Sequence, residues 1–201
     1  MSSLSDQVYN LFASVTGREK IGFLDTSATS LYIAAAAIVF NPVFWNIVAR
    51  LGKTYTPVEY NTHFLTKIFG SPYNGCYALA VTIFSIGIIR DHLYTVALDE
   101  QPVYPPLHQP ELGIGLFLSG NVLVLSSMWA LGVTGTYLGD YFGILMDKKV
   151  EGFPFNVTGA PMYWGSTLSF LGTALYKGRT AGVILTLEVF VMYLIALQYE
   201  E

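Results

Sequence analysis

Long stretches without a charged side chain constrain the fold of this sequence more than any other feature. No charged residue occurs in 26–49, 68–89, 112–139 or 152–176, and Glu188 is the only one in 180–199. A helix needs roughly 20 mostly apolar residues to cross the bilayer core, so each stretch is long enough. Charged residues make up 12% of the 201 residues, about half the share in soluble domains. The pattern predicts an all-α, polytopic integral membrane protein.

Five apolar segments are assigned within these stretches, at 28–49, 73–90, 112–135, 162–176 and 181–199. Asn41-Pro42 interrupts the first, which is therefore predicted to be kinked or re-entrant, because proline breaks or kinks a helix. The second and third are the clearest spanning helices. The fourth rises only roughly 22 Å and is short for a core of about 30 Å, whereas the fifth is long enough to cross.

Lys177-Gly178-Arg179 separates the last two segments, which predicts a C-terminal helical hairpin. Basic side chains gather in 50–72 and 136–161, while 90–111 carries one arginine and four carboxylates. By the positive-inside rule, 50–72 and 136–161 face the cytosol. The hairpin then returns Glu200-Glu201 to the cytosolic side.

The chain is predicted to form one membrane-embedded domain over 1–201, in which 1–27 is a surface segment or a tail. The first 25 residues carry five charges and no compact apolar region, so a cleavable signal peptide is not expected. Cys76 is the only cysteine, which excludes an internal disulfide and a CxxC metal site. The net charge of −4, without a basic patch, argues against a nucleic-acid partner.

Common catalytic patterns are missing from the sequence. His63, His92 and His108 are assigned to different loops and have no HxxxH or ExxH spacing, so no metal site is predicted. There is no GxSxG and no P-loop. Ser126-Ser127 lies within an apolar segment, where hydroxyls are expected to bond to helix carbonyls.

Three acidic features have both a functional and a structural interpretation. Glu200-Glu201 ends the last segment, where the helix dipole disfavours negative charge; the pair is either a solvated tail or a site for a cationic group. Asp140 and Tyr141, in LGDYFG, are either an interfacial anchor or part of a site. Glu188 is an intramembrane carboxylate, which is by default a functional hypothesis, although a protonated group packed on another helix fits as well.

Small residues in the third segment predict close helix contact. Gly113, Gly115 and Gly120 are of the type that lets two membrane helices approach closely. Near the fourth segment, Asn156-Val-Thr158 matches a glycosylation acceptor. Because its loop is predicted to be cytosolic, we expect Asn156 to be unmodified.

Five long runs closely resemble the eukaryotic phospholipid N-methyltransferases, most of all the fungal branch. The runs are NPVFWNIVAR (41–50), GCYALAVTIFSIGIIRD (75–91), LVLSSMWALGVTGTYLGDYFGILMDKKVEGFPFNV (123–157), PMYWGSTLSFLGTALYKG (161–178) and ALQYEE (196–201). The resemblance implies a multi-pass enzyme of the endoplasmic reticulum membrane, or of its mitochondria-associated part, that uses S-adenosylmethionine and no metal. It implies methylation of phosphatidyl-N-methylethanolamine and the dimethyl intermediate to phosphatidylcholine, or all three methylations from phosphatidylethanolamine.

The resemblance also implies a cofactor site. The family's GxG motif maps onto Leu118-Ser119-Gly120, where leucine replaces the first glycine, and its Glu pair maps onto Glu200 and Glu201. The family continues past that pair with a short polar tail, whereas this sequence ends there. More distantly, PMYWG is similar to the PxYxG element of isoprenylcysteine carboxyl methyltransferases, which precedes a helical hairpin whose far end carries a Glu pair. This adds Pro161, Tyr163 and Gly165 as cofactor-binding candidates.

Roles follow from the chemistry that the resemblance implies. Tyr163 or Trp164 is expected to face the sulfonium through a cation–π contact. Asp140 and Tyr141 are the catalytic candidates, because a carboxylate can hold the lipid ammonium or accept its proton. The expected partners are a phospholipid and the bilayer, and the oligomeric state is open. A non-catalytic scaffold or lipid-sensing subunit would share the hydropathy without needing PMYWG or the Glu pair.

Overall fold

Helices make up nearly all of the regular secondary structure in the described residues. The computed structural model describes residues 20–50 and 63–200, apart from the side chains of 46–50, 199 and 200. The elements follow in the order α2 (Thr29–Arg50), α4 (Phe64–Phe69), α5 (Pro72–Glu100), the 3-10 turn η1 (Pro105–Leu107), α6 (Pro110–Thr136), the 3-10 turn η2 (Gly139–Phe142), α7 (Pro161–Lys177) and α8 (Thr180–Glu200). Among the described residues the one β-type pairing is an isolated bridge between Ile21 and Val103. The predicted all-α class is confirmed.

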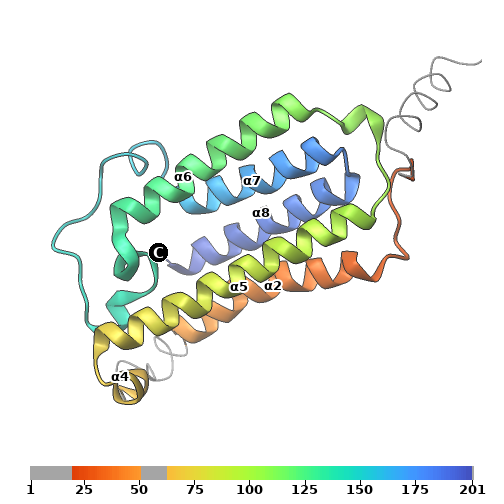
Figure 1. The fold of residues 1–201 in the computed structure, drawn as a ribbon. Helices are drawn as coiled ribbons and strands as arrows, with labels where there is room; N and C mark the ends of the chain where they lie inside the picture. Colours follow the sequence, from red (N-terminus) through yellow and green to blue (C-terminus); the bar gives the residue numbers. More distant parts are fainter. Residues whose placement is uncertain (1–19, 51–62, 201) are drawn as a thin grey trace, which may run out of the picture.

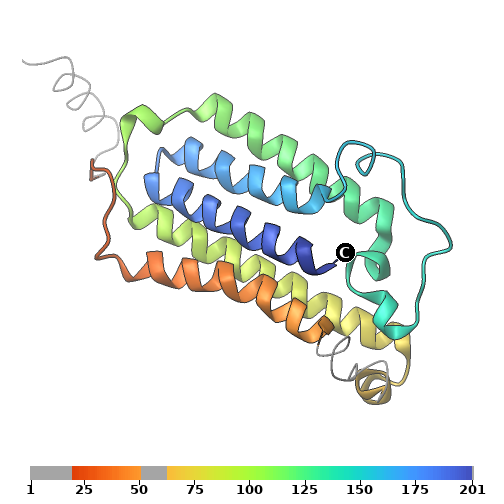
Figure 2. The ribbon, with the colours of Figure 1, turned by 180° about the vertical axis from the view of Figure 1, so that it is seen from behind.

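The long helices α2, α5, α6, α7 and α8 lie side by side along one axis (Figures 1 and 2). One end of this bundle holds α4, η2 and the last turn of α8, and we call it the C-terminal end. The other holds the turn between α7 and α8, and we call it the turn end. Three segments therefore lie at the same end of the bundle, as the loop charges predict. They are the described part of 50–72, the 136–161 connection and the last turn of α8. The side of the membrane that this end faces stays a prediction.

Within residues 20–50 and 63–200, three helices are long and apolar enough to cross a membrane. They are Pro72–Glu100, the continuous stretch Pro110–Phe142 and Thr180–Gln198. These match the second, third and fifth apolar segments. The apolar part of α2, Thr29–Trp45, and the 17-residue α7 are shorter. The predicted class of a helical bundle with helices able to span a membrane is therefore confirmed, and α7 and α8 are joined by a short turn at Gly178.

One sequence-based boundary needs correction. The sequence predicts that the second segment ends at Arg90, but α5 continues as a helix to Glu100. Arg90 and His92 therefore lie within a helix and not in a loop. Helix α2 runs from Thr29 to Arg50 with Pro42 inside it, close to the predicted 28–49, and its kinked or re-entrant path stays a prediction. Of the predicted surface segment or tail at 1–27, residues 1–19 lie outside the described residues.

Proline marks the start of three helices. Pro72, Pro110 and Pro161 each occupy the first turn of α5, α6 or α7. Proline suits this position because its missing N–H would have no partner inside the helix and its φ is already helical. Pro161 therefore begins α7 and does not interrupt it. Gly178, at φ 62, ends α7 and lets the chain turn into α8.

The apolar core lies between α2, α5, α7 and α8. Its buried members are Ala34, Ile38, Tyr94, Ala97, Leu98, Phe170, Leu185, Val189 and Tyr193. The Tyr94 hydroxyl donates to the Phe170 carbonyl oxygen at 2.8 Å and lies 3.2 Å from that of Gly182. One α5 side chain thereby holds both arms of the hairpin.

Helix α6 packs on α7 through two pairs of glycines. A Cβ built on Gly113 would lie 2.6 Å from the Gly172 oxygen, and one on Gly120 would lie 2.3 Å from the Gly165 oxygen. Neither approach leaves room for a side chain, so the expected close contact is confirmed for Gly113 and Gly120. A Cβ on Gly115 would meet no atom within 4 Å among the described residues, so the expectation is wrong there.

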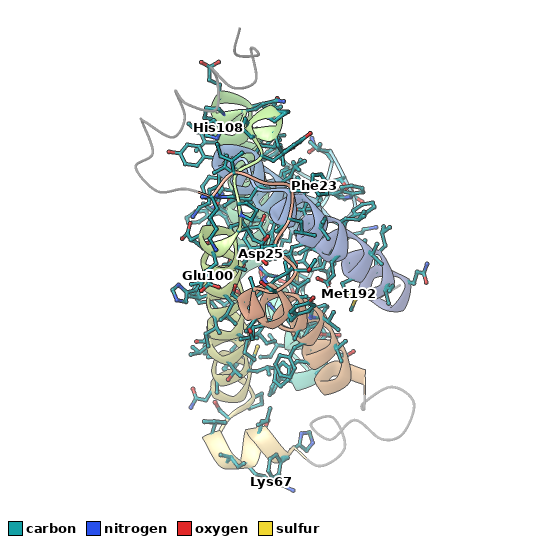
Figure 3. All side chains as sticks on the ribbon, turned by 90° about the vertical axis from the view of Figure 1, so that its right-hand side faces the viewer. Phe23, Asp25, Lys67, Glu100, His108 and Met192 are labelled. Carbon is teal, nitrogen blue, oxygen red and sulfur yellow. The ribbon has the colours of Figure 1, made fainter. Side chains whose placement is uncertain are left out.

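Hydrogen bonds tie the connections together at the turn end, which Figure 3 views with Asp25 and Glu100 labelled near the start of α2. The buried Arg179 donates from Nη1 to the Gln101 carbonyl oxygen at 2.6 Å. The Gln101 side chain donates to the Asp25 carbonyl oxygen and accepts from the Asp25 N–H, at 2.8 and 2.9 Å. Lys177, the last residue of α7, pairs with Asp99 near the end of α5. These bonds fix the position of the hairpin along α5. They therefore determine which side chains of α7 and α8 lie beside which side chains of α5.

Candidate functional site

An aromatic pair lies between the arms of the hairpin, toward the C-terminal end. The rings of Tyr163 and Tyr193 have centroids 4.7 Å apart at an angle of 45°. Next to them, Trp164 lies against Phe190 at 5.6 Å. The antiparallel hairpin brings these two rings to the same level, because Tyr163 and Tyr193 are the same number of residues from the turn at Gly178. Tyr163 of PMYWG thus faces α8.

A buried polar network begins at the hydroxyl of Tyr193. Arg90 of α5 donates to it from Nη1 at 2.7 Å, and the Ser166 hydroxyl of α7 shares a hydrogen bond of 3.1 Å with it. Three helices therefore meet at one tyrosine oxygen. Tyr193 is 6% exposed and Arg90 is 8% exposed, so the network lies inside the bundle.

Arg90 keeps its charge inside the bundle through several contacts. Its Nε donates to Oδ1 of Asp91 at 2.9 Å, and its Nη2 lies 2.8 Å from the same oxygen. Its guanidinium also lies 5.0 Å from the centre of the Phe170 ring, within cation–π range. An unpaired charge within a membrane bundle is expensive, so arginines there are paired and commonly functional. The Asp91 side chain is 58% exposed, which brings this pair to the edge of the bundle.

Sequence reasoning misses this network because it places Arg90 at the start of a loop. A signal is nevertheless present. Tyr94, Ala97 and Leu98 follow at helical spacing, and all three are buried. Treating them as a continued helix face would place Arg90 inside the membrane bundle.

The predicted Leu118-Ser119-Gly120 motif lies on α6 and is divided between two faces. Leu118 is 58% exposed, and the Ser119 hydroxyl donates to the Gly115 oxygen of its own helix. Gly120 is buried against Gly165. Of this motif, Gly120 is the residue in contact with α7.

The PMYWG element forms the first turn of α7. Pro161 and Gly165 are buried, and Trp164 is 42% exposed. Helix α8 ends at Glu200, at the same end of the bundle as this turn. The Glu200 side chain and the whole of Glu201 lie outside the described residues, so the distance from the Glu pair to PMYWG stays a prediction.

The catalytic candidates Asp140 and Tyr141 lie in η2, and Asp140 is exposed. Turn η2 rests on the start of α5, where a Cβ on Gly75 would lie 2.8 Å from the Phe142 ring. From residue 75 to Arg90, α5 rises roughly 22 Å. The structure thus places Asp140 near the surface of the C-terminal end and does not bring it beside the aromatic pair.

The remaining candidates lie on α6, on α8 and in the 136–161 connection. The hydroxyls of Ser126 and Ser127 donate to the carbonyl oxygens of Val122 and Leu123 on their own helix, as predicted. Glu188 is partly exposed in the middle of α8. Asn156 is exposed in the 136–161 connection.

Known proteins resemble the chain over most of its length. The sequence model of the family described as "Phospholipid methyltransferase" matches residues 109–201. The phosphatidyl-N-methylethanolamine N-methyltransferase of Emericella nidulans is 65% identical over 179 residues, which are 89% of this chain and 85% of that protein. The Saccharomyces cerevisiae protein of the same name is 54% identical over 187 residues, 92% of this chain and 87% of the other.

A mammalian protein is similar as well. The Homo sapiens phosphatidylethanolamine N-methyltransferase is 45% identical over 184 residues, 90% of this chain and 89% of that protein. No solved structure gives a significant match.

Proposed function

The chain belongs to the phospholipid methyltransferase family, and from this premise we propose that it methylates phosphatidyl-N-methylethanolamine and then the dimethylated lipid, giving phosphatidylcholine. The likeness to fungal enzymes named for the monomethylated lipid carries the proposal. Three helices able to span a bilayer support it, because the acceptor is a membrane lipid.

S-adenosylmethionine is the methyl donor that the family implies, and it supplies a methyl group on a sulfonium. The aromatic pair of Tyr163 and Tyr193 fits such a cation, since ring faces attract positive charge within about 6 Å. In the transfer, the C–N bond to the lipid amine forms as the C–S bond breaks, and the nitrogen gives up a proton. The protein's task is to align the two partners and exclude water.

We assign the donor site to the halves of α7 and α8 that lie nearest the C-terminal end of the bundle. Tyr163 faces the sulfonium, while Pro161 and Gly165 shape the backbone around it. Glu200 and Glu201, at the end of α8, hold the amino or ribose groups. On α6 we assign Leu118, Ser119 and Gly120 to the same donor site.

The acceptor lipid is proposed to meet the protein first at η2. The amine has an ordinary pKa near 10 and is protonated in neutral water. Asp140, exposed at the C-terminal end, is suited to hold that ammonium or accept its proton, with Tyr141 beside it in the chain. We propose that this end faces the cytosol and that the membrane is the endoplasmic reticulum.

A methyl-transfer assay tests the function. Purified protein in mixed micelles receives radiolabelled S-adenosylmethionine with unmethylated, monomethylated or dimethylated phosphatidylethanolamine. We expect label on the last two lipids and at least tenfold less on the first. Equal labelling of all three would favour an enzyme for the whole series, as the human relative's name suggests. No label on any lipid would favour a scaffold.

A further inference from the structure

Two buried polar side chains lie at the same level of the bundle but on different helices. Ser30 of α2 donates to Glu100 of α5, which fixes the register of these antiparallel helices. Asn41 is eleven residues further along α2, and Arg90 is ten residues back along α5, so their levels agree within roughly 2 Å at a rise of 1.5 Å per residue. Both belong to the bundle interior, at 2% and 8% exposure.

Asn41 carries a hydrogen-bond acceptor with no partner in the described part of the chain. Its Oδ1 is fully buried. Native proteins satisfy nearly all such atoms, so a buried acceptor left open needs a reason. An oxygen of this kind suits an ammonium or another N–H donor.

Arg90 has donors to spare. A guanidinium carries five N–H, and the bonds to Asp91 and Tyr193 use one on each of its three nitrogens. One N–H on Nη1 and one on Nη2 are not used by these bonds, and guanidinium N–H groups bind carboxylate or phosphate oxygens, often as a forked pair. Because the Asp91 side chain is 58% exposed, this part of the network lies toward the bundle surface.

These observations combine next to the aromatic pair. Tyr193, the acceptor of the Arg90 bond, is also the ring that faces Tyr163. Unused guanidinium N–H groups, an amide oxygen without a partner among the described residues and two aromatic rings are groups that suit a zwitterion beside a cationic centre. The sulfonium and the methylated amine are both centres of that kind.

We propose that Arg90 and Asn41 form a buried subsite for the zwitterionic end of a substrate, with its oxyanion on Arg90 and its ammonium on Oδ1 of Asn41. The inference rests on the proposed function, because that function supplies two such substrates. The methionine end of the donor carries a carboxylate and an amine, and the lipid headgroup carries a phosphodiester and an amine.

Binding measurements separate these sources. The affinities of radiolabelled S-adenosylmethionine and of spin-labelled phosphatidyl-N-methylethanolamine are measured on the full-length protein in detergent, without turnover. Arg90→Lys keeps the charge but loses the fork. Arg179→Lys is the matched control, because Arg179 is also buried but lies at the turn end. We expect Arg90→Lys to weaken one of the two ligands at least tenfold and Arg179→Lys to leave both unchanged.

Asn41→Leu distinguishes a subsite from a structural residue. An apolar side chain of similar size removes an unsatisfied buried oxygen and should raise the melting temperature. If Oδ1 binds substrate, the same variant should also weaken, at least fivefold, the ligand that Arg90→Lys weakens. Arg90→Lys and Asn41→Leu acting on the donor would identify the carboxylate, and both acting on the lipid would identify the phosphodiester.

The lipid outcome has a further consequence for Asp140. A phosphoethanolamine headgroup is far shorter than the roughly 22 Å that α5 rises between η2 and Arg90, so the lipid could not bind both at once. Unchanged affinities in Asn41→Leu, or a different ligand affected by each variant, would overturn the subsite. If Arg90→Lys does not fold, Asn41→Leu decides alone. A wild-type protein that binds both ligands but transfers no methyl group would refute the proposed function and leave this test intact.

Discussion

Gly120 and Gly165 lie against each other where α6 meets α7: a Cβ on Gly120 would be 2.3 Å from the Gly165 oxygen, and one on Gly165 would be 2.5 Å from the Gly120 oxygen. Real Cβ atoms do not approach backbone oxygens so closely, so neither position has room for alanine. Both residues are assigned to the cofactor site by resemblance. Their contact gives them a packing role of their own.

Gly120→Ala is predicted to lower the free energy of unfolding by about 1 to 3 kcal/mol, the usual cost of forcing extra atoms into a packed interface. Gly115→Ala is the control on the same helix, where a Cβ meets open space among the described residues. Thermal unfolding in detergent should show a lower melting temperature for Gly120→Ala alone. An unchanged melting temperature with lost donor binding would instead assign Gly120 to the cofactor only.

Tyr193→Phe is predicted to destabilise the protein by about 1 to 3 kcal/mol, because it leaves an N–H of a buried guanidinium without an acceptor. Tyr176→Phe is the matched control, since Tyr176 is 50% exposed on α7. The measurement is the midpoint of thermal unfolding of both variants. Equal midpoints would mean that the Arg90–Tyr193 bond does not contribute to stability.

The sequence is sufficient for features that depend on hydropathy. Charge-free stretches locate the spanning helices, and the short Lys177-Gly178-Arg179 break locates the hairpin turn. Loop charges predict which connections share an end. These features are local or follow from counting crossings, so they need no knowledge of side-chain contacts.

Features that depend on pairing between distant residues could not be predicted. The sequence places Arg90 at a helix boundary because charge normally ends a spanning segment, whereas Tyr193 and Asp91 satisfy its charge in the fold. Likewise, Gly113 and Gly115 look alike in sequence, and only the register of α6 on α7 shows which one is in contact. The site assignments from resemblance stay proposals, because Glu201 and the Glu200 side chain lie outside the described residues.

Asp140→Asn is predicted to reduce turnover at least tenfold while changing donor affinity less than twofold, because Asn keeps the shape but can neither accept a proton nor balance an ammonium charge. Asp147→Asn is the control, an exposed carboxylate in the same connection. The measurement is kcat alongside equilibrium binding of S-adenosylmethionine. Wild-type turnover in Asp140→Asn would remove this residue from the mechanism.

The C-terminal end is predicted to face the cytosol. In a Cys76→Ala background, Gly152→Cys places a thiol at that end and Thr26→Cys places one at the turn end, both at exposed positions. A membrane-impermeant maleimide applied to sealed microsomes should label the first at once and the second only after permeabilisation. The reverse order, or a glycan on Asn156, would invert the orientation.

Locating the methyl donor on the protein tests the proposed donor site most directly. Irradiating the wild-type enzyme with bound, radiolabelled S-adenosylmethionine and sequencing the labelled peptides by mass spectrometry identifies the residues that the donor touches. We predict label in the parts of α7 and α8 nearest the C-terminal end, at or next to Tyr163 and between Tyr193 and Glu201. Label confined to the turn end, around Gln101 and Arg179, would contradict it.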